Sequence, residues 1–242
     1  MMAADGKHVI ITGVSTGIGN KLTRFLLQEG WSVYGLSRRK PDIEASHFFW
    51  CACDITHPAA VAAAVQHLPA TIDALVHNAG ASGAVGPGLS IELEAWRTAF
   101  EVNFFAPLNL TKQVVERCRS NACVVFLSGG GSVTPKPFVG PYAVSKLAAT
   151  KLAEQLALEY PRLRFYALAP GAHNTKLFEE QNSMSSEKLP PFAEFAAVTR
   201  LFQTLIDDTD GRLNGKLVHV RDDIEQLLSV PDGGTIRRVE RR

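Results

Sequence analysis

The chain has 242 residues, of which 46% are hydrophobic and 20% are charged, and its 25 basic and 24 acidic residues leave a net charge of +1. This composition excludes a disordered or collagen-like chain, and the near-neutral charge gives no broad electrostatic reason to expect nucleic acid or an anionic membrane as a partner. A chain of this length is within reach of one α/β domain, so we expect residues 1–242 to fold as a single unit.

Short apolar runs alternate with amphipathic patterns along the chain. The runs predict strands at residues 8–12, 31–36, 47–52, 73–77, 122–127, 163–168 and 215–220. Helical spacing predicts helices at 18–29, 58–65, 91–118, 142–159 and 192–206, and Pro107 is expected to kink or break the third. This alternation is typical of a doubly wound α/β fold with a parallel sheet of about seven strands, in which ligands bind at the carboxyl ends of the strands where the strand order reverses.

Two segments fall outside this alternation. Residues 176–191 are polar and interrupted by proline, which predicts a long irregular loop that contacts a substrate; the alternative is a mobile insertion without a function. Residues 229–242 form a tail whose basic end, 236–242, is expected to be solvated rather than to dock on a partner.

The four cysteines, Cys51, Cys53, Cys118 and Cys123, are too few to staple a chain of this length. We therefore expect free thiols in a reducing compartment, and neither disulfides nor a metal site. The longest apolar stretches fall well short of the roughly 20 residues that a membrane span needs. These features together predict a soluble, cytoplasmic protein.

A glycine-rich segment, Thr-Gly-Val-Ser-Thr-Gly-Ile-Gly at 12–19, lies between the first predicted strand and the first predicted helix. Glycines there permit a tight turn and a close approach of the backbone to a pyrophosphate, which would face the free N–H groups of the helix N-terminus. The alternative is an ordinary flexible turn. Its place in the first βα turn favours a dinucleotide site formed by Gly13, Ser15, Thr16, Gly17, Ile18 and Gly19.

The second predicted strand is followed by Ser37, Arg38 and Arg39, where a carboxylate would hold the ribose 2′-hydroxyl of NAD. A 2′-phosphate would gain charge-assisted hydrogen bonds from a guanidinium, so the pattern favours NADP(H) over NAD(H). The alternative is a pair of solvated surface arginines.

Further polar residues follow the third and fourth predicted strands. Asp54 and Ile55 come after one, and Asn78, Ala79 and Gly80 after the other, where the adenine half and the ribose of a dinucleotide would pass. Taken alone, Asp54 is also a candidate helix cap and Asn78 a candidate turn former.

Tyr142 and Lys146 are four residues apart on a predicted helix, which sets the phenol and the ammonium group on one face. A nearby positive charge favours phenolate, so we expect it to lower the pKa of Tyr142 toward neutrality and make the tyrosine a general acid or base. The alternative is a surface pair, which is the usual meaning of this spacing in a helix.

Together these residues resemble the short-chain dehydrogenase/reductase family. The motifs that match its order and spacing are residues 12–19, Asp54, 78–80, Asn103, 142–146 and 170–171, so the resemblance covers about residues 7–220. It implies a single Rossmann domain with a nicotinamide cofactor, hydride transfer at a carbonyl or alcohol, and a homodimer or homotetramer built on the long helices.

The resemblance also implies roles for individual residues. Tyr142 would exchange the hydroxyl proton, Lys146 would bind the nicotinamide ribose and lower the pKa of the tyrosine, and Asn103 would anchor a water in a proton relay. Pro170, Gly171 and Thr175 would border the nicotinamide.

One position departs from the family pattern. The serine that contacts the substrate carbonyl normally lies thirteen residues before the tyrosine, and here that residue is Gly129. Ser128 is our candidate replacement, and Ser132 is a second one. His173 stands where an aliphatic residue is usual, either within reach of the substrate or as a partly exposed loop residue.

We therefore expect an NADP(H)-dependent ketoreductase that acts on a small carbonyl or alcohol substrate. The first alternative is a cofactor-binding regulator or scaffold with weakened chemistry, which Gly129 motivates. The second is an epimerase or dehydratase that keeps its NAD bound.

Overall fold

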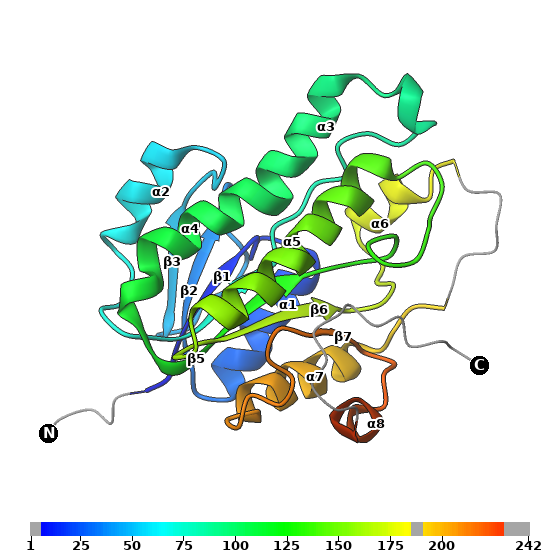
Figure 1. Ribbon diagram of the computed structural model, residues 1–242. Helices are drawn as coiled ribbons and strands as arrows, with labels where there is room; N and C mark the ends of the chain where they lie inside the picture. The colour runs from blue at the N-terminus through cyan, green and yellow to red at the C-terminus, as the bar shows by residue number, and fades with distance from the viewer. Residues whose placement is uncertain (1–5, 185–190, 230–242) are drawn as a thin grey trace, which may run out of the picture.

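The protein is described here from a computed structural model, which covers residues 6–184 and 191–229. In these ranges the centre of the molecule is one parallel sheet of seven strands in the order β3-β2-β1-β4-β5-β6-β7 (Figure 1). The strands are β1 (His8–Thr12), β2 (Ser32–Ser37), β3 (Phe48–Ala52), β4 (Ile72–His77), β5 (Cys118–Leu127), β6 (Arg164–Ala169) and β7 (Leu217–His219). The predicted doubly wound parallel sheet is confirmed.

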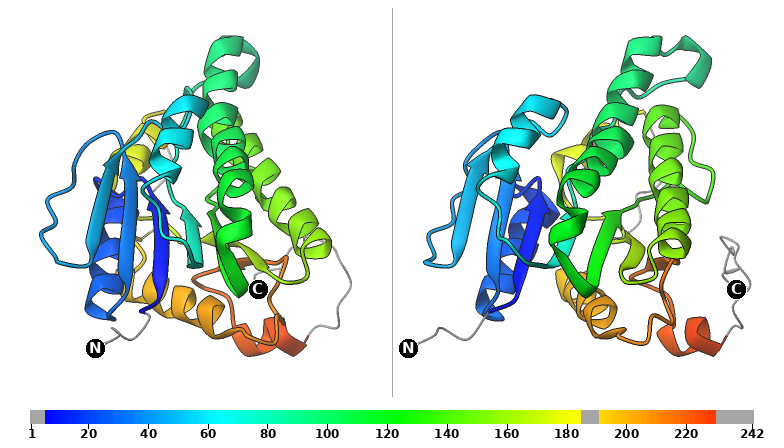
Figure 2. Two further views of the ribbon diagram at one scale, coloured as in Figure 1. Left: turned by 90° about the vertical axis from the view of Figure 1, so that its left-hand side faces the viewer. Right: turned by 60° about the vertical axis from the view of Figure 1, so that its left-hand side comes forward.

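Helices cover both faces of the sheet (Figure 2). They are α1 (Gly17–Gln28), α2 (Pro58–Val65), α3 (Leu93–Phe100), α4 (Ala106–Val114), α5 (Gly140–Glu159), α6 (Lys176–Gln181), α7 (Phe195–Asp207) and α8 (Ile224–Ser229). Ile10 packs with α2, α4 and α5 on one face, whereas its neighbours Val9 and Ile11 pack with α1 and α7 on the other. Because all three side chains are fully buried, the strands are continuous apolar runs rather than alternating ones.

The predicted helix at 91–118 is one continuous helical run, but it is irregular at a different place. Residues Glu101–Phe105 form a π-helical turn, labelled η2, between α3 and α4, and Pro107 lies in the first turn of α4. Proline lacks an N–H group and crowds the carbonyl four residues before it, and a wider turn relieves both constraints. The irregularity therefore precedes the proline. The run ends with a 3₁₀ turn, η3 (Val115–Arg117), so the end predicted at Cys118 was one residue too late.

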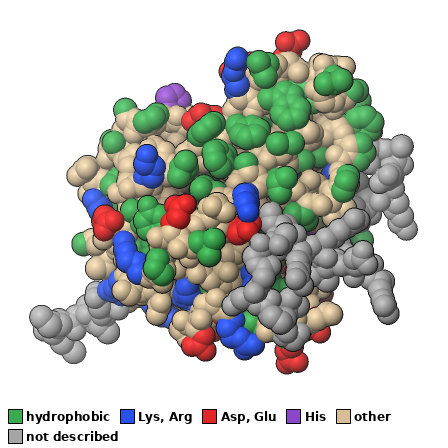
Figure 3. All heavy atoms as spheres, viewed as in Figure 1, with side chains coloured by type: hydrophobic (Ala, Val, Ile, Leu, Met, Phe, Trp, Pro, Cys, Tyr) green, Lys and Arg blue, Asp and Glu red, His purple; other side chains and the backbone are tan. Residues whose placement is uncertain are grey.

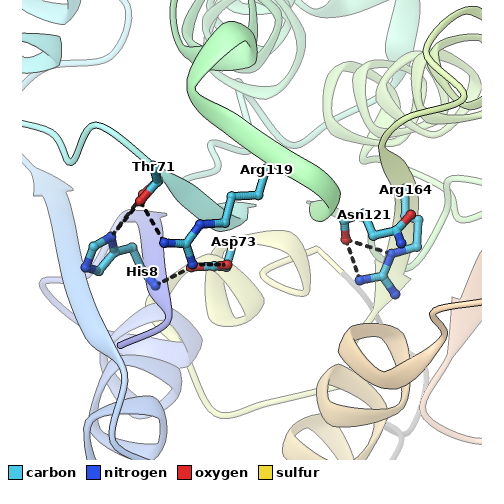
Figure 4. Close-up of polar contacts among 6 residues, drawn as sticks. All are labelled: His8, Thr71, Asp73, Arg119, Asn121 and Arg164. Carbon is cyan, nitrogen blue, oxygen red and sulfur yellow. Dashed lines mark hydrogen bonds and ion pairs between the residues drawn. The ribbon is translucent and has the colours of Figure 1, made fainter. Parts of the chain in front are cut away.

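Charged side chains form polar contacts along the edge where the amino ends of the strands lie (Figure 4). Arg119 of β5 pairs with Asp73 of β4, with 3.0 Å between Nη1 and Oδ1. Arg164 of β6 donates from Nε to the carbonyl of Asn121 at 2.9 Å and from Nη1 to the carbonyl of Leu205, near the end of α7, at 3.0 Å. Strand β5 therefore begins at Cys118, four residues earlier than predicted, because polar residues that looked like a loop pair across this edge.

Several segments differ from the predictions or lie beyond the described residues. The segment 176–191 was predicted to be irregular, but it begins with the six-residue helix α6. Helix α8 follows the last strand and was not predicted. Residues 185–190 of the predicted substrate loop, and the predicted tail from 230 onward, lie outside the described residues. All four cysteines are free thiols. In the part of the chain that is described, no helix combines the length and the apolar character needed to cross a bilayer.

Candidate active site

A cleft of about 1290 Å³ lies at the carboxyl ends of the strands, on both sides of the point where the strand order reverses between β1 and β4. That volume exceeds the usual size of a single small-molecule pocket, so it accommodates a dinucleotide and a substrate together. Two of the predicted site residues, Gly19 and Asn103, do not line the cleft. The other predicted site residues line it: Gly13, Ser15, Thr16, Gly17, Ile18, Ser37, Arg38, Arg39, Asp54, Ile55, Asn78, Ala79, Gly80, Ser128, Tyr142, Lys146, Pro170, Gly171 and Thr175.

The glycine-rich turn fits an anion. Gly13 has a φ of +74°, and a Cβ atom there would lie 2.9 Å from the Cα of Ala79. Thr16 is the N-cap of α1 but makes no capping hydrogen bond from its side chain, and the first turn of the helix carries no acidic residue. The helix N-terminus therefore presents free N–H groups and an unopposed dipole to the cleft, as a pyrophosphate site requires.

Asn78 holds this turn against β4. Its Nδ2 donates to the carbonyls of Thr12, at 2.9 Å, and Gly13, at 3.0 Å. The backbone N–H groups of Asn78 and Ala79 both donate to the Thr12 hydroxyl at 3.1 Å. Gly19 packs against this arrangement, because a Cβ there would overlap the Asn78 amide and the Gly13 carbonyl. Asn78 and Gly19 thus fix the conformation of the glycine-rich turn.

At the end of β2 the three predicted residues behave differently. The Ser37 hydroxyl donates to the carbonyl of Arg39 at 2.7 Å and accepts from the indole of Trp50 at 3.0 Å, so its hydrogen is committed. Arg38 is 79% exposed and lies 4.0 Å from Asp54, a loose contact that leaves its guanidinium free to reorient. Burial raises the pKa of Asp54, but hydrogen bonds from Thr56, together with the charges of Arg38 and His57, outweigh it and hold that pKa below its ordinary value.

Tyr142 and Lys146 lie in the first turns of α5 and are both nearly buried, at 6% and 4% exposure. The Lys146 Nζ donates to the carbonyl of Leu127 at 2.7 Å and lies 5.9 Å from the centre of the tyrosine ring. Burial lowers the pKa of Lys146 to about 8. Burial also raises the pKa of Tyr142 to about 12, so the expectation that the lysine would bring this pKa toward neutrality is wrong.

Asn103 lies in the π turn and is 1% exposed. Its Oδ1 accepts from the N–H of Ala81 at 3.0 Å, and its Nδ2 donates to the carbonyl of Ala81 at 2.8 Å and to the hydroxyl of Ser145 at 2.9 Å. Its side chain therefore joins the helix α3–α4, the segment after β4 and helix α5. Both of its N–H bonds are used, which leaves only carbonyl oxygens to hold a water.

The segment after β5 passes directly under the tyrosine. A Cβ atom at Gly129 would overlap the Tyr142 hydroxyl and lie 3.0 Å from its Cζ. The Ser132 hydroxyl donates to the Gly129 carbonyl at 2.8 Å, and the Ser128 hydroxyl lies 3.0 Å from Ser132 Oγ and 3.2 Å from Thr150 Oγ1. In this arrangement neither serine has a hydrogen left for a substrate oxygen, so the role predicted for Ser128 requires this segment to rearrange.

His173 is buried, and its Nε2 bonds to the carbonyl of Pro170 at 2.9 Å. Burial lowers its pKa. The ring lines the cleft in a fixed orientation, in contrast to the partly exposed loop residue that was the alternative.

Sequence reasoning predicted that the segment 176–191 contacts the substrate, but it missed the helix α6 and did not single out Gln181. Leu177, Phe178 and Gln181 all line the cleft. The available signal was local: Thr175 caps the helix by accepting from the N–H of Phe178 at 3.2 Å, and Leu177 and Gln181 are spaced four apart. The polar composition of 176–191 concealed this short helix.

Comparison with known proteins agrees with this geometry. The family described as short chain dehydrogenase matches residues 7–186. The chain is 29% identical to the benzil reductase ((S)-benzoin forming) of Saccharomyces cerevisiae over 82% of this chain and 84% of that protein. It is 28% identical to the NADPH-dependent 3-dehydrocapnine reductase of Ornithobacterium rhinotracheale over 73% of this chain and 69% of that protein. The structure of 3-ketoacyl-(acyl-carrier-protein) reductase from Brucella melitensis complexed with NADH superposes with a TM-score of 0.80 at 21% identity, covering 89% of this chain and 96% of that one.

The contact between Gly129 and Tyr142 predicts a sharp difference between two adjacent glycines. We expect Gly129→Ala to lower the free energy of unfolding by about 1–3 kcal/mol, because the new methyl group must displace a buried phenol. A Cβ atom at Gly130 would meet nothing within 4 Å, so Gly130→Ala is the matched control and should change stability by less than about 1 kcal/mol. Urea unfolding followed by circular dichroism measures both, and equal losses would contradict the packing described here.

The depressed pKa of Lys146 predicts how stability depends on pH. The folded protein releases this proton above pH about 8, whereas the unfolded chain holds it up to its ordinary pKa of 10.5. The unfolded state binds more protons in that window, so this group makes the folded state more stable as pH rises through it. Relative to Lys146→Met, the cofactor-free protein should gain up to about 3 kcal/mol between these two limits. If the free energy of unfolding of the two proteins changed with pH in the same way across this window, the Lys146 ammonium would not be desolvated.

Proposed function

Because the chain belongs to the short-chain dehydrogenases, we propose that it is an NADP(H)-dependent oxidoreductase that interconverts a carbonyl compound and a secondary alcohol, acting chiefly as a ketoreductase. The observation that carries this proposal is the buried pair Tyr142 and Lys146, which lies in the same cleft as an uncapped, glycine-rich helix N-terminus. A proton donor and an anion site in one cleft are the two things that such a reaction requires.

The residues present suit a nicotinamide dinucleotide. The turn at Gly13 and the N-terminus of α1 would hold the pyrophosphate, Asp54 and Ile55 would border the adenine half, and Gly171 and Thr175 would border the nicotinamide. When bound, the nicotinamide supplies or accepts the hydride.

Tyr142 would protonate the substrate oxygen during reduction. Its raised pKa keeps the phenol protonated throughout the physiological range, so the donor form is always present. Lys146 would stabilise the phenolate that remains after the transfer, because its ammonium lies beside the ring and is anchored by the Leu127 carbonyl. Asn103 would act by holding α5 and the Ala81 segment in place, and through its backbone carbonyl it remains our candidate for anchoring a water.

The preference for NADP(H) rests on charge. Arg38 and Arg39 border the cleft at the end of β2, where the usual carboxylate of NAD sites is replaced by these cations; the Asp54 carboxylate, which follows β3, lies 4.0 Å from Arg38. Since the Ser37 hydroxyl is committed, the arginines rather than the serine would recognise the phosphate. The NADPH-dependent relative supports this preference, and the benzil reductase supports a ketone substrate. The NADH in the superposed ketoreductase indicates that the fold alone does not decide between the two coenzymes.

A second candidate is a protein that binds the dinucleotide but does little chemistry. Gly129 favours it, because this glycine removes a hydroxyl next to the tyrosine and the neighbouring serine hydroxyls are committed. Losing one such donor typically slows an enzyme by about a hundredfold or more without abolishing turnover, so we rank this candidate second.

We also propose a homo-oligomer. Apolar side chains gather on the face that α3 and α5 present (Figure 3), where Leu93, Val144 and Leu147 are 62%, 45% and 39% exposed. Exposed apolar side chains grouped on long helices suit a contact between copies of the chain.

Tyr142→Phe tests the proposed chemistry. We expect the wild-type protein to consume NADPH in the presence of benzil or another member of a ketone panel. The loss of NADPH absorbance over time measures this turnover. The phenylalanine variant should lose about a thousandfold in kcat, since it lacks the proton donor, while its affinity for NADPH changes little. A wild-type protein that binds NADPH but turns over no ketone would favour the second candidate instead.

Arg38→Ala tests the coenzyme preference. Removing one charge-assisted contact to the 2′-phosphate should raise the KM for NADPH by about 10- to 100-fold and leave the KM for NADH nearly unchanged. Lys40→Ala is the matched control, because Lys40 is exposed two residues further along and carries the same charge. If both variants raised the KM for NADPH equally, the effect would come from the overall positive charge of this surface rather than from recognition by Arg38.

A further inference from the structure

A ketone that receives a hydride develops negative charge on its oxygen, and a second hydrogen-bond donor beside the proton donor stabilises that charge. Next to Tyr142 the chain offers Gly129, which has no side chain, and two serines whose hydroxyl hydrogens are committed. None of these three residues offers a free side-chain donor, which directs attention to another element of the cleft.

Gln181, the last residue of α6, reaches this position. Its side chain lines the cleft together with Tyr142, although the residue is only 8% exposed. Its amide lies close enough to the tyrosine hydroxyl to favour the ionised form and oppose the effect of burial. Yet the Gln181 Nε2 atom is buried and makes no hydrogen bond of normal geometry to any residue that the structure describes. Its neighbour is the Tyr142 hydroxyl, but the alignment is poor, so a substrate oxygen placed beside that hydroxyl would give the buried NH₂ group a better acceptor.

The helix that carries Gln181 is held from several sides. Thr175 caps its start, and Lys136, from the segment after β5, donates to the side chain of Asn182 at 2.9 Å. Asn182 in turn donates to the carbonyl of Phe178 at 2.6 Å, and the Phe178 ring packs edge-on against Phe192 with centroids 5.4 Å apart. The helix that carries Gln181 is therefore anchored before a substrate arrives.

We propose that Gln181 is a catalytic residue that donates a hydrogen bond from Nε2 to the oxygen of the substrate carbonyl, beside the proton donor Tyr142. This inference rests on the proposed ketoreductase function. As the carbonyl carbon gains a hydride from the reduced coenzyme, the C=O double bond becomes single, the oxygen takes the proton of Tyr142, and tyrosinate remains. Gln181 gives up no atom and stabilises the charge on the oxygen.

The neighbouring residues limit the substrate. Leu177 and Phe178, from the same helix, line the cleft next to Gln181. A ketone whose oxygen meets the amide would have its flanking groups against these apolar side chains. The substrate class is thus a ketone with apolar or aromatic substituents.

Two variants of Gln181 test the proposal, with Glu179→Met as the matched control on the exposed face of the same helix. Gln181→Met keeps the shape and removes the donor, so kcat with benzil and NADPH should fall by about a hundredfold. The affinity for benzil in the presence of NADP⁺, measured by calorimetry, should fall by about fivefold, while NADP⁺ affinity is unchanged. The control should match the wild-type protein in all three measurements.

Gln181→Glu gives a signature that a packing role would not produce. A protonated carboxyl group is a donor and a carboxylate is not, so this variant should regain activity as pH falls, whereas the wild-type protein should show no such rise. Equal activity and equal benzil affinity in the wild type and Gln181→Met would overturn the role of Gln181, and so would a Gln181→Glu profile parallel to that of the wild type. A wild-type protein without turnover would instead overturn the proposed function, a separate outcome.

Discussion

The hydrogen bonds of Asn78 with the turn at Thr12 and Gly13 are the contacts on which the site depends. They join the carboxyl ends of β1 and β4, the two strands between which the order of the sheet reverses. Because helices leave the sheet in opposite directions at this point, a cleft opens there. The close approach that Gly13 and Gly19 permit then brings the N-terminus of α1 against the cleft, and the anion site follows from this packing.

Burial, more than the charge of the neighbouring lysine, sets the protonation of the reacting pair. Tyr142 and Lys146 are enclosed by β5 and the start of α5, and removal from water disfavours the ionised form of each. The result is a phenol that stays protonated and an ammonium that is more easily neutralised than a solvated one. Such a pair suits proton donation, which is the direction required for reduction. A ligand that brought opposite charge or excluded further water would shift both values.

Much of the fold follows from features that are local in the sequence. Strands buried on both faces are apolar runs, and Val9, Ile10 and Ile11 show why no alternation is needed. The long-range features were harder to predict. Arg119 pairs with Asp73 of the neighbouring strand, and the Ser37 hydroxyl donates to the Arg39 carbonyl and accepts from the distant Trp50. The helix α6 was concealed by the polar composition of its segment, and contacts with Lys136 and Phe192 hold it in place.

The glycine beside the tyrosine connects these points. With a Cβ atom at Gly129, the phenol could not occupy its present position, so the glycine and the placement of Tyr142 depend on each other. The space for a side chain at Gly129, in the segment after β5, is therefore filled by the tyrosine itself, and we place the second donor on another element of the cleft. On α6 the Gln181 amide lies next to the phenol, and among the described residues its Nε2 has no well-aligned acceptor. The position of the donor, rather than its presence, is what the substitution at Gly129 changes, and a donor on α6 makes the rate depend on the same helix that selects the substrate.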